Sequence, residues 1–387
     1  MPGFEVIGRE EFEQVQEVFQ DGGGILFRHS FDHLRNEVYK VRDFEDAFAQ
    51  RMEVRHALAV TSGTAALRVA LAGLEIGSGD EVITQSFTFV ATVEAIIEAR
   101  AIPVVVDVDD TLNMDSEALE EAITDRTKAV IVVHMLGVPA RMDEIKRICR
   151  DRGILLIEDT AWGCGGRFSG KPLGTIGDVG TFSFDFAKTM TTGEGGMVVT
   201  NDTHVDDMAR AWHDHGHENN PELPRWEDSR HGSGFNYRMT ELQGAVGLAQ
   251  LEKLDGVIAA QRKNKAKLMS ALDGLSGLTW RTIPDGAEET ADALIFFVED
   301  NYSALRCRQL LLEEGIGTKI LPEAITWHFA GTWDHMPELV SARSGDLASR
   351  FTRSAELLGR SVALPVNVLM DEGMPERAYR ALIPELR

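Results

Sequence analysis

The segment 153–200, GILLIEDTAWGCGGRFSGKPLGTIGDVGTFSFDFAKTMTTGEGGMVVT, decides the fold of this chain. Three runs in it are almost continuously apolar or β-branched: 153–159, 179–184 and 195–200. Such runs are typical of strands that are buried on both faces, as parallel strands are. The last two runs are separated by only a short connection, so the regular winding of the chain changes there.

Upstream of this segment, short strand-like runs alternate with helical periodicity. Further strands are expected at 56–60, 81–85, 102–108 and 129–135. Helices are expected at 64–74, 91–99, 115–123 and 142–152, with Ser116 as the N-cap of the third. This alternation indicates an α/β fold with a mostly parallel sheet.

The pattern changes after residue 200. A polar loop is expected over 213–234, a long amphipathic helix over 238–272, and then a strand within 290–300 and a helix over 303–315. We predict a large α/β domain, residues 1–254, whose N-terminal segment packs on a smaller α+β domain, residues 255–387. Two domains suit 387 residues, at about 150 residues per domain.

Composition excludes several classes of function. The chain has 39 Lys and Arg against 62 Asp and Glu, a net charge of −23, which argues against nucleic acid and anionic membranes as partners. Apolar runs such as 129–138 are shorter than the roughly 20 residues of a membrane-spanning helix. The first residues lack the basic and apolar parts of a signal peptide, and the three cysteines are scattered. We therefore expect a cytoplasmic protein that acts on small molecules.

Two of the chemically informative segments follow strands. In TSGTAAL (61–67), a glycine turn opens a helix and leaves backbone N–H groups that suit a phosphate, although an ordinary strand-to-helix turn has the same appearance. Asp159 ends the strand 153–159, and ligands of open α/β sheets bind beyond the carboxyl ends of strands. Its carboxylate could keep a heteroaromatic nitrogen protonated or could cap the next turn.

A lysine and a glycine-rich turn make up the third segment. Lys188 follows the strand 179–184, and GEGG (193–196) leads into the next strand. A surface lysine is the simpler interpretation. The functional interpretation is a Schiff-base lysine whose pKa is lowered by desolvation and cationic neighbours, with the glycines letting the backbone pass close to it. A fourth segment, NYR (236–238), by itself indicates only the start of the long helix.

The combination SGTAAL…ED…FSFxxxK…GEGG…NYR over residues 30–260 resembles the DegT/DnrJ/EryC1/StrS family. These are pyridoxal-phosphate-dependent aminotransferases of fold type I that act on keto sugars in amino-sugar biosynthesis. The resemblance implies that Lys188 forms the Schiff base and moves the proton, and that Asp159 pairs with the pyridinium nitrogen. Other implied cofactor residues are Gly63, Thr64, Ala65 and Ser183 at the phosphate, Asn236 from the neighbouring subunit, and Phe89 over the ring.

One position departs from the family pattern. Three residues after the aspartate the family usually has His or Gln near the phenolic oxygen of the cofactor, whereas this chain has Trp162. An indole N–H donates a hydrogen bond but accepts none, so the change affects cofactor electronics rather than reaction class. Dehydrating relatives carry histidine at the lysine position, and Lys188 therefore favours amino transfer.

A narrower resemblance, to the 8-amino-3,8-dideoxy-octulosonate transaminases, covers MPGFE (1–5), FRHSFDHLRN (27–36) and HDHGH (213–217). It implies an anionic sugar acid as the acceptor. The substrate candidates that we take from these loops and from the C-terminal half are His29, His33, Arg35, His215, His217 and His328. A zinc site at His213, His215 and His217 would lack an evident fourth ligand, so we predict no metal site.

The family resemblance implies a homodimer with shared active sites and a two-stage reaction. An amino acid, by family habit L-glutamate, would load pyridoxal phosphate, and a keto or aldehyde sugar would then be aminated. The sugar could be nucleotide-linked or a sugar acid. A cyclitol ketone is the alternative acceptor, and a non-catalytic cofactor or sugar sensor is the alternative class, disfavoured by Lys188, Asp159 and GEGG. The side chains of Trp327, His328, Trp333 and His335 could be core residues or could border the sugar site.

Overall fold

The computed structural model describes residues 2–220, 222–323, 325–341 and 347–386. Its centre is a seven-stranded sheet in the order β1-β9-β8-β5-β4-β2-β3. The strands are β1 (His56–Val60), β2 (Glu81–Gln85), β3 (Ile102–Val106), β4 (Thr127–Val133), β5 (Leu155–Asp159), β8 (Val179–Ser183) and β9 (Gly196–Thr200). The predicted α/β class with a mostly parallel sheet is confirmed.

Strand direction changes where the sequence pattern changes. The pairs β3–β2, β2–β4, β4–β5 and β5–β8 are parallel, whereas β9 is antiparallel to both β8 and β1. The connection from β8 to β9 contains no crossover helix, and without one neighbouring strands run antiparallel. This connection carries Lys188.

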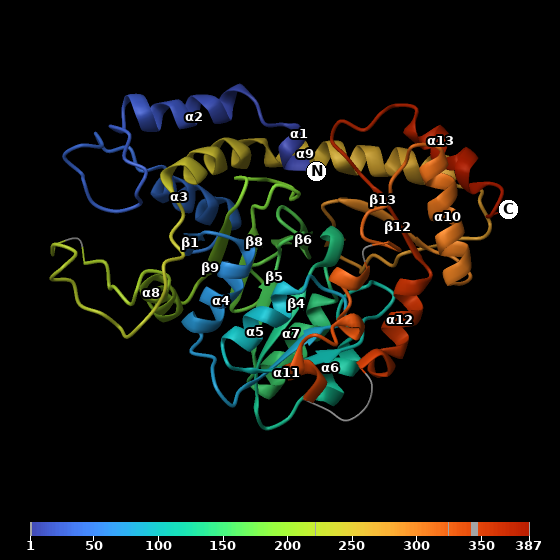
Figure 1. Ribbon diagram of the computed structural model, residues 1–387, viewed down its shortest axis with the longest axis horizontal. Helices are drawn as coiled ribbons and strands as arrows, with labels where there is room; N and C mark the ends of the chain where they lie inside the picture. The colour runs from blue at the N-terminus through green and yellow to red at the C-terminus, as the bar shows by residue number, and fades with distance from the viewer. Residues whose placement is uncertain (1, 221, 324, 342–346, 387) are drawn as a thin grey trace.

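Helices cover both faces of the sheet (Figure 1). They are α3 (Lys40–Met52), α4 (Gly63–Gly73), α5 (Ala91–Glu98), α6 (Ser116–Ala122), α7 (Met142–Arg152) and α8 (Thr203–Trp212). The predicted cap of α6 is wrong by one residue. Asp115 is the N-cap and accepts from the amides of Glu117 and Ala118, because its carboxylate reaches them while the Ser116 hydroxyl turns toward Glu144.

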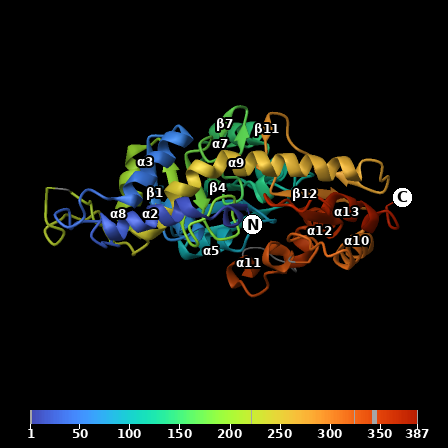
Figure 2. The ribbon, with the colours of Figure 1, turned by 90° about the horizontal axis from the view of Figure 1, so that it is seen from above.

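The long helix α9 (Glu241–Leu272) runs along the top of the molecule and connects its two parts (Figures 1 and 2). It begins three residues later than predicted, after a capping box made by Thr240 and Gln243. The helix α2 (Arg9–Gln20) packs along it, and the short helix α1 (Pro2–Glu5) lies near its middle. The proposed domain boundary at 254/255 falls inside α9.

The C-terminal part contains a second, antiparallel sheet. Its strands are β10 (Thr279–Trp280), β12 (Ala293–Phe297) and β13 (Ser361–Pro365). Its helices are α10 (Asn301–Glu313), α11 (Pro337–Ser341), α12 (Thr352–Gly359) and α13 (Met374–Leu382). A small third sheet joins β6 (Arg167–Phe168), β7 (Lys171–Pro172) and β11 (Ala287–Glu288), and short 3₁₀ turns lie at η1 (Met135–Gly137), η2 (Ile325–Trp327), η3 (Ala330–Thr332) and η4 (Leu347–Arg350).

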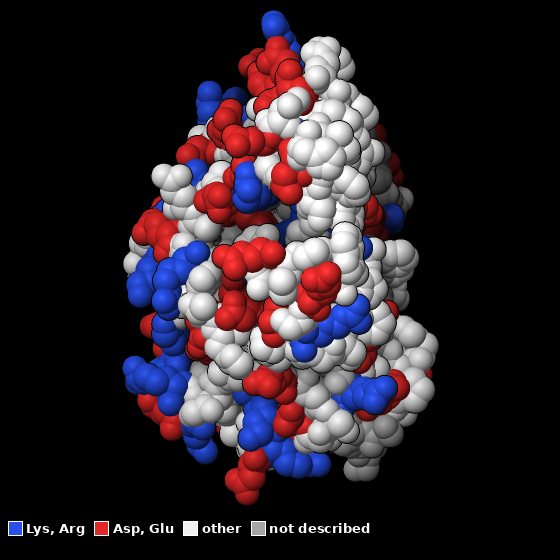
Figure 3. Space-filling model, turned by 90° about the vertical axis from the view of Figure 1, so that its left-hand side faces the viewer, with Lys and Arg blue, Asp and Glu red and all other residues white. Residues whose placement is uncertain are grey.

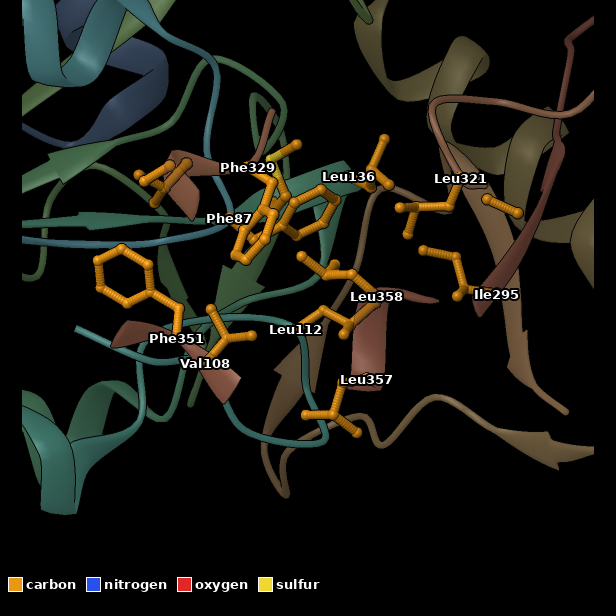
Figure 4. Packing of buried hydrophobic residues seen from close by; sticks show 14 of the residues in the cluster. Phe87, Val108, Leu112, Leu136, Ile295, Leu321, Phe329, Phe351, Leu357 and Leu358 are labelled. Atoms are coloured by element: carbon orange, nitrogen blue, oxygen red, sulfur yellow. The ribbon is translucent and has the colours of Figure 1, made fainter. Parts of the chain in front are cut away.

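One hydrophobic cluster joins the two parts of the chain. Phe87 and Leu136, from loops at the edge of the large sheet, pack with Ile295, Phe329 and Leu358 from the C-terminal part (Figure 4). All five side chains are at most 5% exposed. This burial holds the segment around Phe329 against the loops that follow β2 and β4, beside the carboxyl ends of the parallel strands. None of the described helices combines the length and apolar character that crossing a bilayer requires.

Candidate active site

A cavity of about 300 Å³ lies beyond the carboxyl ends of β5 and β8, next to the start of α4. This is where open α/β sheets bind ligands, because the loops there diverge. The sequence-predicted residues that line it are Gly63, Thr64, Phe89, Asp159, Trp162, Ser183, Lys188 and His328. Residues from five separate parts of the chain therefore meet in one cavity.

Asp159 ends β5 and is 5% exposed. Its Oδ2 accepts a hydrogen bond from the Thr92 hydroxyl at 2.9 Å, and its Oδ1 accepts from the Ala161 amide at 3.2 Å. Burial raises the pKa of Asp159 above its usual range, while these two hydrogen bonds and the charge of Lys188 oppose the rise. A buried carboxylate of this kind is stabilised by a cationic partner in the cavity.

The neighbouring carboxylate points the other way and is structural. Glu158 is fully buried, and its oxygens accept hydrogen bonds from the amides of Gly174, Ile176 and Gly177. His134 Nε2 lies 3.1 Å from Glu158 Oε2, and because His134 Nδ1 accepts from the Ala140 amide, Nε2 is the donor. Adjacent side chains on a strand point to opposite faces, so only Asp159 of this pair reaches the cavity.

Lys188 lies in the turn between β8 and β9. Desolvation lowers its pKa to about 8, against the opposing effect of the nearby carboxylates of Asp185 and Asp159. Its Nζ lies 3.4 Å from the centroid of the Trp162 ring, which is within cation–π distance. A lysine with this pKa is present in part as the neutral amine near pH 8.

The glycine-rich turn 193–196 leaves room for the backbone at the start of α4 rather than for Lys188. A Cβ on Gly196 would lie 2.3 Å from the carbonyl oxygen of Ser62, in the turn that opens α4. Gly193 has φ +81°, which favours glycine. The absence of side chains at these positions therefore lets β9 pass directly beneath the start of α4.

The start of α4 forms a cradle of the size and polarity that a phosphate requires. Ser62 is the N-cap, and its Oγ accepts from the Ala65 amide at 3.0 Å, so the amides of Gly63 and Thr64 remain without a partner inside the helix. A Cβ on Gly63 would lie 2.7 Å from Ser183 Cβ and would fill the cradle. These groups fit a phosphorylated cofactor. Ala65 is not among the residues that line the cavity, and its amide donates to Ser62 Oγ.

The C-terminal part contributes His328 to the lining of the cavity. The Phe89 ring is 38% exposed and lies 5.5 Å from the His328 ring and 6.4 Å from the Trp327 ring. The His328 carbonyl accepts from the Thr88 amide at 2.9 Å. The four C-terminal aromatic residues that could be core residues or could border the sugar site differ in position. His328 lines the cavity and Trp327 is exposed, whereas Trp333 is a core residue and His335 is exposed on the surface.

The other predicted substrate residues lie elsewhere in this chain. His29 and His33 line a separate cavity of about 680 Å³ between the loops 21–39 and 219–228. His29 Nε2 lies 3.2 Å from Asp214, and His33 is exposed. Figure 3 views the side that carries these loops and shows acidic and basic side chains intermixed, with no continuous basic patch on that face.

Three more of these candidates have other contacts. Arg35 is fully buried. Its guanidinium donates a hydrogen bond to the carbonyl of Phe27, in the same N-terminal loop, and lies near the carboxylate of Glu241. His217 is buried and paired with Asp228 at 3.0 Å. His215 is exposed. None of the three lines the cavity that contains Lys188. Among the described residues, no cluster of three or more His, Cys, Asp and Glu side chains could hold a metal ion.

Asn236 does not line that cavity in its own subunit, although the carbonyl of the next residue, Tyr237, accepts from the Thr61 amide at 3.0 Å. It is exposed and forms an isolated antiparallel bridge with Asp214, within the projecting loop region. Its assignment to the site of a neighbouring subunit stays a prediction.

Sequence reasoning missed three contributors. Ser62 caps α4 and Thr92 holds Asp159; the S-G-T pattern signals the first, and nothing in the sequence signals the second. The third is an ion pair between half-buried Lys319 and buried Asp292, with Lys319 Nζ 2.6 Å from Asp292 Oδ2 and 5.0 Å from the Trp162 ring centroid. The charge of Lys319 contributes to the lowered pKa of Lys188.

Comparisons with known proteins identify the family to which this chain is similar. The model of the DegT/DnrJ/EryC1/StrS aminotransferase family matches residues 29–382. GDP-perosamine synthase of Escherichia coli O157:H7 is 43% identical over 224 residues, which are 58% of this chain and 60% of that protein. The match thus spans about three fifths of that relative. The spore coat polysaccharide biosynthesis protein SpsC of Bacillus subtilis is 30% identical over 95% of this chain and 92% of its own length.

A solved structure shows the same fold over almost the whole chain. The aminotransferase from Psychrobacter cryohalolentis superposes with a TM-score of 0.84 at 26% identity, covering 97% of this chain and 96% of that one.

Proposed function

The chain belongs to the DegT/DnrJ/EryC1/StrS aminotransferase family, whose members depend on pyridoxal phosphate, and we propose that it transfers an amino group to a keto or aldehyde sugar. L-glutamate is the proposed donor. The observation that carries the proposal is the meeting of Asp159, Lys188 and the start of α4 in one cavity. The sugar-related names of the relatives support the class of acceptor.

Bound pyridoxal phosphate would supply an aldehyde that accepts the amino group and a ring that withdraws electrons from the donor's Cα. Asp159 would hold the ring nitrogen in its protonated form, and this pairing would offset the desolvation of the carboxylate. The amides of Gly63 and Thr64 and the Ser183 hydroxyl would hold the phosphate, and Phe89 would pack on the ring.

Lys188 would act first as the attachment point and then as the acid and base. Its pKa of about 8 leaves a useful fraction of neutral amine at physiological pH, which can accept the proton from the donor's Cα. The Trp162 ring holds the Nζ over the cavity. Because one amine performs both tasks, loss of Lys188 removes attachment and proton transfer together.

Shared active sites of a homodimer are part of the proposal. Large apolar side chains are exposed along residues 4–27: Phe4, Ile7, Phe12, Phe19, Leu26 and Phe27. A second copy of the chain would cover them, and exposed Asn236 would then reach the partner's phosphate cradle.

Mixing two inactive variants tests site sharing. Asn236→Ala and Lys188→Ala chains are mixed, dissociated and reassociated. If sites span the interface, one kind of hybrid site contains both native residues, and activity returns in proportion to the hybrid fraction. Activity that stays absent in demonstrated hybrids contradicts shared sites.

The acceptor is the least specified part of the proposal. The candidates are a nucleotide-linked keto sugar, an aldehyde sugar acid of the octulosonate type and a cyclitol ketone. The protein is loaded with the amino group from glutamate, and each acceptor is added while the return of the aldehyde form is followed by absorbance. A cyclitol as the best acceptor would replace the sugar proposal, and no spectral response to any amino donor would favour a cofactor or sugar sensor.

We also propose a cytoplasmic location. The three cysteines, Cys149, Cys164 and Cys307, are buried and free, as a reducing compartment permits.

A further inference from the structure

The N-terminal segment, residues 2–8, contacts the turn that carries Lys188, and none of its residues lines the cavity. The amide of Gly3 donates a hydrogen bond to the carbonyl oxygen of Lys188 at 3.0 Å. The two residues are distant in sequence, yet α1 lies in both views near the junction between the large sheet and the C-terminal part (Figures 1 and 2). Nothing in the described mechanism uses this contact.

The fit at Gly3 excludes a side chain. A Cβ there would lie 2.8 Å from Met190 Cα and 2.9 Å from both Met190 C and Thr191 N. All three atoms belong to the backbone, so they cannot rotate away as a flexible side chain could. Any side chain at position 3 would force α1 and the Lys188 turn apart.

Further contacts fix the segment on both sides of Gly3. The Phe4 ring packs edge-on against Phe186, two residues before Lys188, with ring centroids 5.4 Å apart. Glu5 Oε2 accepts from the Leu369 amide at 2.7 Å, in the loop after β13. The Val6 carbonyl accepts from Lys253 Nζ at 2.8 Å, on α9. The segment therefore contacts α9, the C-terminal part and the Lys188 turn at the same time.

A second route from the N-terminal region reaches the same turn. Glu11 Oε1, on α2, accepts from Gln250 Nε2 at 2.8 Å, and Gln250 Oε1 accepts from the Thr191 amide at 3.2 Å. Lys253 also binds Glu11 at 2.8 Å. The N-terminal region thus contacts the Lys188 turn directly at the Lys188 carbonyl and indirectly, through Gln250, at the Thr191 amide.

From these contacts we infer that Gly3 and Phe4 are positioning residues for Lys188: they set the orientation of the 188–189 peptide and hence the reach of the lysine side chain into the cavity. The inference rests on the proposed role of Lys188. A displacement of about 1 Å of a catalytic group can cost about a hundredfold in rate, so a small shift of this turn has a measurable effect.

The test compares Gly3→Ala with Gly8→Ala in the full-length protein. Gly8 belongs to the same segment, but a Cβ there has its nearest neighbour at 3.5 Å, which is ordinary contact. The first readout is hydrogen–deuterium exchange of the cofactor-free protein over residues 185–193, which depends on no chemistry. We expect Gly3→Ala to raise exchange there about tenfold, Phe4→Ala to raise it less, and Gly8→Ala to leave it unchanged.

The second readout is the protein loaded with pyridoxal phosphate. Gly3→Ala is expected to move the pH midpoint of the bound cofactor's absorbance and to lower kcat with glutamate at least fivefold, with KM within twofold of wild type. The Gly8→Ala control should retain the wild-type values. The inference is overturned if Gly3→Ala has the same exchange, pH midpoint and kcat as the wild type. It is also overturned if Gly3→Ala and Gly8→Ala lose kcat equally.

The two proposals fail in distinguishable ways. If wild-type protein never attaches pyridoxal phosphate at Lys188, the proposed function fails, whereas the exchange measurement still decides whether Gly3 holds the turn.

Discussion

Lys188 Nζ lies 3.4 Å from the centre of the Trp162 ring, and Lys319 Nζ lies 5.0 Å from the same ring. The π face attracts an ammonium group and so favours the charged form of Lys188, whereas burial and the charge of Lys319 disfavour it. The family resemblance predicts His or Gln at this position, whereas this chain has Trp162. In this chain, an aromatic face therefore takes part in setting the protonation of the lysine.

Replacing Trp162 by Leu should lower the pKa of Lys188 further below about 8. A lost cation–π contact of about 1 kcal/mol corresponds to a titration midpoint roughly 0.7 pH units lower. The measurement is NMR of the cofactor-free protein after reductive ¹³C-methylation, with the Lys188 signal assigned from Lys188→Arg. Trp226→Leu, at an 85% exposed position, serves as the control. A midpoint that rises or stays in place contradicts the role of the ring.

Replacing Lys188 by Ala should abolish turnover, because the same amine attaches the cofactor and moves the proton. Borohydride reduction of the wild-type protein with pyridoxal phosphate should label one peptide, at position 188, as mapped by mass spectrometry. The Lys188→Ala protein should bind pyridoxal phosphate without becoming labelled. A label on another lysine, or full activity in the variant, would refute the assignment.

Replacing Asp159 by Asn should slow proton removal from the donor by about a hundredfold or more, because the ring nitrogen loses its charged partner. The effect should appear in kcat of the glutamate half-reaction, measured by stopped-flow absorbance, with donor KM little changed. Asp185→Asn tests whether a neighbouring negative charge alone is responsible, and it should have a much smaller effect.

Asp159→Asn should also stabilise the cofactor-free protein at neutral pH. Burial raises the pKa of Asp159 in the folded state, so the folded protein holds this proton more tightly than the unfolded chain. The resulting stability is fully present below the unfolded pKa and is lost as pH rises through the folded pKa. The variant should therefore have the higher Tm at pH 7, and the difference should disappear at acidic pH. A wild-type protein that is the more stable at pH 7 would contradict this sign.

Replacing Gly63 by Ala should weaken pyridoxal phosphate binding at least tenfold, because the new Cβ would lie 2.7 Å from Ser183 Cβ in the phosphate cradle. Equilibrium titration followed by absorbance measures the Kd. Gly256→Ala is the matched control: this helical position has no neighbour within 4 Å, so affinity should stay unchanged and stability should rise by up to about 1 kcal/mol. Unchanged affinity in Gly63→Ala would remove the cradle from the proposal.

Much of the architecture could be predicted because its signals are local. The central strands were expected within a few residues of their observed bounds, and strand–helix alternation predicted the mostly parallel sheet. Finer local details were less accurate. Asp115 caps α6 in place of Ser116, since several polar side chains near a helix start compete for the same amides.

The candidate site shows the same division. Asp159 ends a buried strand and Lys188 follows another, and ligands of open α/β sheets bind beyond the carboxyl ends of strands, so their positions in the sequence predicted that both would face the cavity. No comparable signal in the sequence indicates where Arg35 lies. Arg35 was expected at a substrate, but the packing of the N-terminal loop places it in a fully buried position near Glu241.

By itself, then, the sequence determined the family, the α/β class and the residues at the carboxyl ends of β5 and β8, because periodicity and motif spacing act over short distances along the chain. Only the tertiary structure decided that Thr92 would hold Asp159, that His328 would line the cavity beside Phe89, and that Gly3 would contact the Lys188 turn. These contacts join distant segments through packing, and their geometry depends on the whole core rather than on any local pattern.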